Sequence, residues 1–407
     1  MKVQEDPQVS QLTSLYNERF EKLLLSLDEA IIDAGRKTER QKIIEDSEQF
    51  EARRELLMVE EIANKKREIQ ASAKNAFLLQ IESKFHQALL PELELEFRNI
   101  DIIMNKILKF DSNLGRLLDI LYTDSCSISR IVACLENIPW LSESIMMFVK
   151  QPKYRRVDSA GRPVILKTIR ASLSFIGIES LRILIPVLVA KHTNPAKSEF
   201  TPDLPRNLWM YTIGCGNIGQ ALAEKNGLRP HFGYCIGLFS NIGRSIIANL
   251  YLRTFDRMLT QQIIKARKSN NPNQAKALSA LEPSHKYLIS LWKKHASRIT
   301  GDVISGLNCK WLTIAAGLQD YSKIREMTIA HVDKIDVHPL TKLLFNAQGF
   351  MQYKMLSKDK LIGKEESMIF LRNFGIGSND VAIVSKVNLT GIELNISGKL
   401  PDDVNSS

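Results

Sequence analysis

The chain has 407 residues, of which 44% are hydrophobic and 25% charged, and it carries a net charge of +10. This balance excludes a disordered or fibrous protein, and the length allows two or three domains with a large core. The five cysteines form no C-x-x-C pair, which excludes a zinc ribbon and favours a reducing, cytoplasmic compartment. The most apolar run, Ile183 to Ala190, is far shorter than the roughly 20 residues that cross a bilayer, so we expect no membrane contact.

The first 99 residues predict long helices. Apolar residues recur every three or four positions between Leu12 and Ala34, which traces one helix face that Gly35 ends. A highly charged segment follows over 37–69, and a third apolar stripe runs from Phe77 to Leu89, where Pro91 ends or kinks the helix. We expect residues 1–99 to form two or three helices, arranged as a bundle or as a coiled-coil-like arm.

The charge is distributed unevenly along the chain. Residues 1–99 contain 15 Lys and Arg against 20 Asp and Glu, a net charge of −5, whereas the remainder contains 40 against 25, a net charge of +15. This asymmetry indicates a domain boundary near residue 99. A basic domain attracts nucleic acid, nucleotides or other acidic partners, although a solubilising surface explains the charge equally well.

Residues 100–330 predict a compact all-α domain. Short segments with apolar residues at helical spacing are ended by residues such as Pro139 and Pro152, and no alternating strand pattern lies between them. Residues 331–407 predict a helical C-terminal extension with a frayed tail, in which the β-branched run 381–389 could instead be a strand.

One motif points to a different fold. The run from Gly214 to Gly219 spells G-x-G-x-x-G, the fingerprint of a dinucleotide-binding loop. No acidic residue follows at the distance that a ribose hydroxyl requires, and no βαβ units follow either. We therefore favour a helix over 207–226 whose small residues allow close packing.

Several segments of the domain, in their order and spacing, resemble the HDOD family, a non-hydrolytic, all-helical offshoot of the HD phosphohydrolases. The matching segments are Ser127 to Leu141, Ser172 to Gly177 with Leu181-Arg182, Leu208 to Thr212, Gly237 to Arg244 (Gly-Leu-Phe-Ser-Asn-Ile-Gly-Arg), His295-Ala296 and Trp311. The resemblance covers about residues 100–330 and implies an HD-like fold.

The resemblance also implies a metal site that this chain has lost. Tyr211 stands where the first histidine ligand is expected, Ser240 and Asn241 replace the His-Asp pair, and Leu318-Gln319 occupies a His-His position. Neutral hydroxyl and amide groups cannot replace imidazole and carboxylate ligands of a divalent ion. We therefore expect no metal, no cofactor and no catalytic residue, and we expect Ser240 and Asn241 to cap and pack the start of a helix.

The resemblance implies a bacterial regulatory module in signal transduction, which acts through protein partners and could form homo-oligomers through its N-terminal helices. One alternative is a residual metal-dependent phosphohydrolase acting on nucleotides. Another is a nucleotide or nucleic-acid binding regulator that uses the basic domain. Its candidate anion-binding residues are Lys153, Arg155, Arg156 and Arg162, although a solvated turn explains this cluster more simply.

Overall fold

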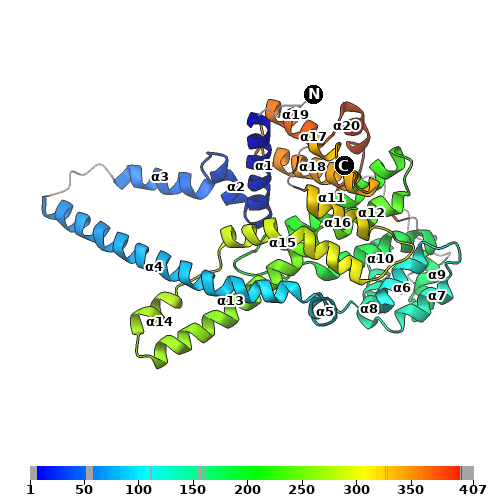
Figure 1. Ribbon diagram of the computed structural model, residues 1–407, viewed down its shortest axis with the longest axis horizontal. Coiled ribbons are helices and arrows are strands. Elements are labelled where there is room, and N and C mark those ends of the chain that lie inside the picture. The colour runs from blue at the N-terminus through cyan, green and yellow to red at the C-terminus, as the bar shows by residue number, and fades with distance from the viewer. Residues whose placement is uncertain are drawn as a thin grey trace.

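The protein is all-helical, as predicted, with no strand in the part that the structure describes (Figure 1). The computed structural model describes residues 7–51, 58–110, 112–154, 158, 162, 164–325, 327, 329–394 and 396, and for 7–9, 46–51 and 58–75 it describes the backbone alone.

The helices of the N-terminal region are α1 Pro7–Leu25, α2 Leu27–Asp33, α3 Glu39–Glu51 and α4 Met58–Arg98. The central helices are α5 Ile100–Ile102, the π-helix η1 Ile103–Leu108, α6 Ser112–Leu121, α7 Ile128–Leu135, α8 Pro139–Phe148, the 3₁₀ helix η2 Pro152–Tyr154, α9 Ile169–Ile176, α10 Ile178–Thr193, α11 Leu204–Lys225, α12 Pro230–Phe239, α13 Ile242–Lys268, α14 Pro272–Leu278, α15 His285–Gly306 and α16 Ala315–Ile324. The last helices are α17 Ile329–Val332, α18 Pro339–Lys358, α19 Lys364–Asn373 and α20 Ser378–Val384.

The apolar stripe from Leu12 to Ala34 belongs to two helices rather than one. Ser26 caps the second helix, because its hydroxyl accepts a hydrogen bond from the backbone of Glu29, and the chain turns there. Arg19 Nε of α1 then lies 2.9 Å from Asp33 Oδ2, which ties α2 back against α1. The apolar spacing continues across the turn, so it could not reveal the break.

Helices α3 and α4 project from the body as an arm (Figure 1). The helix α4 continues through Pro91, so of the two predicted alternatives, an end or a kink, the end is wrong. The second half of α4 packs against α13, where the rings of Phe85 and Phe255 lie 4.9 Å apart and a 3.1 Å hydrogen bond joins His86 to the Tyr251 hydroxyl. These contacts anchor the base of the arm.

The G-x-G-x-x-G run lies inside α11, which confirms the predicted helix and rules out a dinucleotide loop there. The glycines allow α11 and α12 to approach each other closely. A Cβ atom at Gly219 would lie 2.3 Å from the carbonyl oxygen of Gly233, and one at Gly233 would lie 2.2 Å from the oxygen of Gly219. Close packing therefore offsets the poor helix propensity of glycine.

The C-terminal extension completes the body. Residues 378–384 are helical, so the strand alternative is wrong there. Helix α18 packs against α11, α12 and α16, and α1 packs against α11, α18 and α19. Arg19 Nη1 donates to the carbonyl oxygen of Leu361 at 2.8 Å, and Asn373 donates to Thr13. The two ends of the chain therefore lie side by side, and the domain boundaries near 99 and 330 stay predictions.

Among the described residues, no single helix combines the length and apolar character of a membrane span. The pair α9 and α10 passes this test only together, and the two helices meet at a bend of 113°.

A histidine links α2 to the body and generates a pH prediction. His285 Nδ1 lies 2.6 Å from Glu29 Oε1, and its Nε2 lies 3.0 Å from the carbonyl oxygen of Phe200. Burial alone would lower the pKa of His285, but the Glu29 carboxylate and the carbonyl outweigh burial, so the pKa is raised. The interaction therefore stabilises the fold fully at pH values below the pKa of histidine in the unfolded chain, about 6.5. This contribution to the free energy of unfolding is lost as the pH rises through the pKa of His285 in the folded protein.

We expect His285→Gln to lower the free energy of unfolding by about 1 kcal/mol more at pH 6 than at pH 9, a modest effect because Glu29 is partly exposed. Urea denaturation of both proteins across this range measures the difference. A His285→Gln effect on the free energy of unfolding that is the same at pH 6 and at pH 9 would contradict the assignment.

Candidate functional site

The three positions that the family resemblance assigns to a lost metal site lie around one buried arginine. Tyr211 lies in the middle of α11, while Ser240 and Asn241 join α12 to α13. Arg244, in the first turn of α13, donates from Nη1 to Asn241 Oδ1 at 2.8 Å, and its guanidinium carbon lies 5.7 Å from the centre of the Tyr211 ring. Ser240 and Arg244 line the same cavity.

The chain reaches this geometry through a tight junction between α12 and α13. Ser240 Oγ donates to the carbonyl oxygen of Gly237 at 2.7 Å, and Asn241 occupies the first cap position of α13 without a side-chain cap hydrogen bond. The expected capping by Asn241 is therefore wrong, because its amide oxygen binds Arg244 instead. The expected packing is present, since Ser240 and Asn241 are buried.

The start of α13 is held close to α15. The backbone amide of Gly243 donates to Thr300 Oγ1 at 2.9 Å, and a Cβ atom at Gly243 would lie 2.0 Å from the carbonyl oxygen of Ala296. Only glycine fits between the two helices at this point, and the contact fixes the direction in which Arg244 extends.

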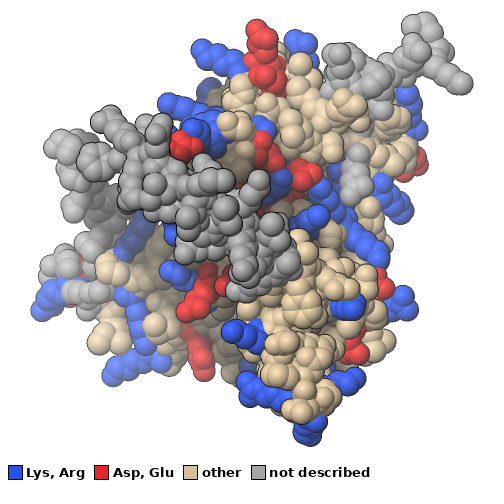
Figure 2. All heavy atoms as spheres, turned by 90° about the vertical axis from the view of Figure 1, so that its left-hand side faces the viewer, with Lys and Arg blue, Asp and Glu red and all other residues tan. Residues whose placement is uncertain are grey.

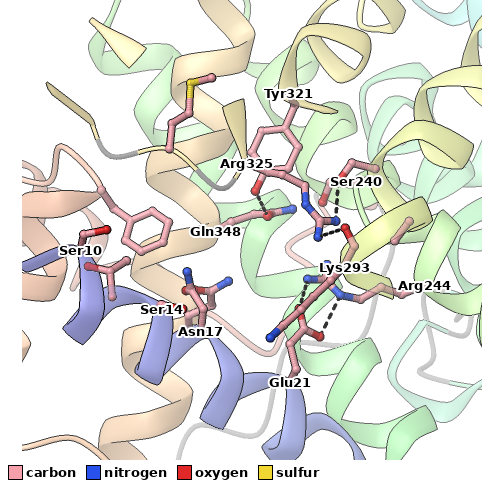
Figure 3. Close-up of a pocket in the computed structure, with 16 residues that line it drawn as sticks. Ser10, Ser14, Asn17, Glu21, Ser240, Arg244, Lys293, Tyr321, Arg325 and Gln348 are labelled. Atoms are coloured by element: carbon pink, nitrogen blue, oxygen red, sulfur yellow. Dashed lines mark hydrogen bonds and ion pairs between the residues drawn. The ribbon is translucent and has the colours of Figure 1, made fainter. Parts of the chain in front are cut away.

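Glu21 of α1 supplies the counter-charge to Arg244 (Figure 3). Its Oε1 lies 2.6 Å from Nη2 and its Oε2 lies 3.4 Å from Nε, while the two side chains are 10% and 11% exposed. Burial alone would lower the pKa of Arg244, but the Glu21 carboxylate outweighs it, so the pKa is raised. The guanidinium is therefore a permanent charge within the site.

The remaining polar groups around Arg244 are neutral. Burial raises the pKa of Tyr211 well above its usual value and that of Tyr321 to about 12, so both phenols keep their protons. Gln352 Nε2 donates to the Tyr211 hydroxyl at 3.3 Å, and the Tyr321 hydroxyl donates to Gln348 Oε1 at 2.5 Å.

This set of donors does not fit a divalent ion. Phenol, hydroxyl and amide groups are weak ligands, and the resident guanidinium repels a second cation. In the described parts of the chain, no three His, Cys, Asp or Glu side chains gather closely enough to hold a metal. Leu318 is buried in the core and Gln319 donates to Ser305, so neither residue completes the site.

A cavity of about 320 Å³ opens beside Arg244, between α1 and the helices α15, α16 and α18 (Figure 3). Its lining includes three basic side chains, Arg244, Lys293 and Arg325, and one acidic side chain, Glu21. Three buried lining atoms have no hydrogen-bond partner within the described residues: Asn17 Oδ1, Gln348 Nε2 and Gln352 Oε1. The cavity is therefore basic and contains unsatisfied polar groups.

The basic cluster that the sequence singled out lies elsewhere, between α8 and α9. Lys153 lies over the ring of Tyr154, and Arg162 forms a 2.9 Å ion pair with Asp158, while Arg155 and Arg156 lie outside the described residues. Figure 2 shows the opposite side of the molecule from α8 and α9 (Figure 1), and on that side basic side chains lie among acidic and neutral ones. An anion site at this cluster stays a prediction.

Sequence reasoning missed the residues that define the site. Arg244 ends the segment Gly237 to Arg244, but its partner Glu21 lies 223 residues away, and no local pattern joins them. Gln348 and Gln352 offered a signal, because two glutamines one helical turn apart interrupt an apolar stretch of α18.

Comparison with known proteins gives a family match over part of the chain. Residues 108–288 match the family model described as "HDOD domain", and no curated protein matches the sequence. One similar solved structure is named "Putative phosphohydrolase", from Shewanella amazonensis SB2B, with 17% identity, a TM-score of 0.38 and coverage of 71% of this chain and 90% of that one. Another, "Putative metal-dependent phosphohydrolase" from the same organism, has 13% identity, a TM-score of 0.37 and coverage of 72% and 98%.

The buried ion pair of Glu21 and Arg244 predicts that the loss of one partner destabilises the fold more than the replacement of both would suggest. We expect Glu21→Gln to lower the free energy of unfolding by about 3–5 kcal/mol, because it leaves the guanidinium of Arg244 buried without a counter-charge. The double variant Glu21→Leu, Arg244→Met should lose less than the sum of its two single changes, since it leaves no unpaired charge.

Urea denaturation at pH 7 measures these values. Lys37→Gln is the control, because it breaks an exposed ion pair of the same 2.6 Å length with Glu45 and should change stability by less than about 1 kcal/mol. Equal effects of Glu21→Gln and Lys37→Gln would show that the buried pair contributes no more to the free energy of unfolding than an exposed pair does.

Proposed function

We propose that residues 108–288, which match the HDOD model, form an HDOD domain, and that the protein is a non-hydrolytic regulatory module in signal transduction that acts by binding other proteins. The observation that carries the proposal is the ion pair of Arg244 and Glu21. A hydrolytic HD site needs an exchangeable divalent cation with an open position for water. Here the guanidinium of Arg244 lies among Tyr211, Ser240 and Asn241. It is already paired with the carboxylate of Glu21.

The origin of Glu21 supports a regulatory role. Glu21 belongs to α1, outside the matched domain, so the state of the site depends on the position of the N-terminal helix. The same segment continues through α2 and α3 into the arm, which connects the site to a surface available for partners (Figure 1).

Metal content and turnover test the non-hydrolytic part. We expect the purified full chain to contain only traces of manganese, iron or zinc, and to leave bis(p-nitrophenyl) phosphate and nucleoside monophosphates intact when these metals are added. Asn241→Asp should also stay metal-free, because the new carboxylate would bind Arg244, whose Nη1 already lies 2.8 Å from Asn241 Oδ1.

Mass spectrometry of the metals and a phosphate-release assay give the readouts. Stoichiometric metal, together with turnover that Tyr211→Phe abolishes, would contradict the proposal.

For the arm, we propose contact with a second copy of this chain. Its described part exposes four large apolar side chains, Ile43, Ile44, Phe77 and Leu79, and contact with the arm of a second copy would remove them from water. Light scattering after gel filtration should detect a dimer that dissociates in the double variant Ile43→Glu, Leu79→Glu.

Leu95→Glu is the matched control, because Leu95 is as exposed as Leu79 and lies on the same helix but at the base of the arm. A wild-type chain that stays monomeric at high concentration would exclude self-association through the arm.

A further inference from the structure

The cavity beneath α1 has the features of a small-molecule site. Its volume of about 320 Å³ falls within the roughly 300–1,000 Å³ typical of ligand pockets. One wall is α1, which contributes Ser14, Asn17 and Glu21, and the opposite walls are α15 and α18, which contribute Lys293, Gln348 and Gln352. A molecule bound here would contact both the N-terminal helix and the body.

The charges in the lining favour an anion. Arg244, Lys293 and Arg325 face a single carboxylate, Glu21, among the described lining residues. Glu21 pairs with Arg244, and Arg325 donates to the carbonyl oxygen of Trp292 and to Ser297 Oγ. Among the described residues, Lys293 forms a long ion pair, 3.5 Å, with Glu18 outside the cavity, so its ammonium is the group best placed to bind a ligand near the opening.

The unsatisfied buried atoms specify the rest of the ligand. Gln348 is 2% exposed, and the Tyr321 hydroxyl occupies its carbonyl oxygen, which leaves the amide nitrogen as an unused donor. Gln352 Oε1 and Asn17 Oδ1 are unused acceptors. Buried polar groups normally have partners, so these three atoms call for a ligand that offers both acceptors and donors.

We propose that the cavity binds a phosphate monoester whose organic part carries hydroxyl or amino groups. The phosphate, with a charge of about −1.5 to −2 at neutral pH, would accept hydrogen bonds from Lys293 and from the amide of Gln348. The organic part would donate to Asn17 and Gln352. This inference rests on the proposed non-hydrolytic role, because the ester is held and not cleaved. Its consequence is that the ligand fixes α1 against the body.

Titration calorimetry of the full chain tests the site with three probes: glycerol 3-phosphate, adenosine monophosphate and inorganic phosphate. We expect one of the esters to bind at least about tenfold more tightly than inorganic phosphate, because only an ester reaches both sets of polar atoms. The comparison of the two esters identifies the organic part as a polyol or a nucleoside.

Two variants locate the binding. Lys293→Met should weaken ester binding by about tenfold or more, which is the typical effect of losing a charged hydrogen bond. Lys294→Met is the matched control, because the adjacent Lys294 pairs with Glu94 outside the cavity. This variant should bind the ester as tightly as the wild type does. Ser14→Trp should also abolish binding, because the exposed Ser14 lines the cavity and a bulky side chain would fill it.

The outcomes separate the two proposals. Absence of binding by all three probes, or equal binding by Lys293→Met and Lys294→Met, would overturn the ligand site and leave the non-hydrolytic role standing. Binding with metal-dependent release of phosphate from the ester would overturn the non-hydrolytic role, on which this inference depends, while still locating a ligand in the cavity.

Discussion

A buried guanidinium requires a partner, and this requirement organises the centre of the molecule. Arg244 has 2.6 and 2.8 Å contacts with Glu21 and Asn241, and removing the carboxylate would leave an uncompensated charge in the interior. The N-terminal helix that carries Glu21 is therefore held to the body, over the residues that match the HDOD model, by electrostatics as well as by apolar packing. Its apolar face contributes Phe20, whose ring lies 4.7 Å from that of Tyr211.

The same pair changes the chemistry that the fold can support. A divalent ion exchanges with solvent and activates water, whereas a guanidinium is fixed in place and stays protonated at every accessible pH. The phenols of Tyr211 and Tyr321 also keep their protons, since burial raises the pKa of each. The fixed positive charge of Arg244 fits the proposed role in recognition.

The helices could be predicted from periodicity, and the limits of that prediction are physical. The helix through Gly214 and Gly219 could be predicted because the acidic residue and the strands of a dinucleotide-binding unit are absent from the sequence that follows. Its glycine at 219 allows close contact with Gly233. The turn at Ser26 was hidden, because the apolar spacing is the same on both sides of it. Tyr211, Ser240 and Asn241 could be predicted as site positions by family resemblance, but Glu21 could not, since ion pairs across 223 residues leave no trace in a local pattern.

The order in which the chain is made runs against the order in which its parts can pack. Helix α1 leaves the ribosome before the helices that it packs against, yet Arg19 binds the carbonyl of Leu361, 342 residues later, and Thr13 binds Asn373. Contacts this distant in sequence close slowly. During synthesis the apolar face of α1 therefore stays exposed until the C-terminal helices have been made. A chain truncated near residue 340 would leave that face accessible to chaperones and proteases.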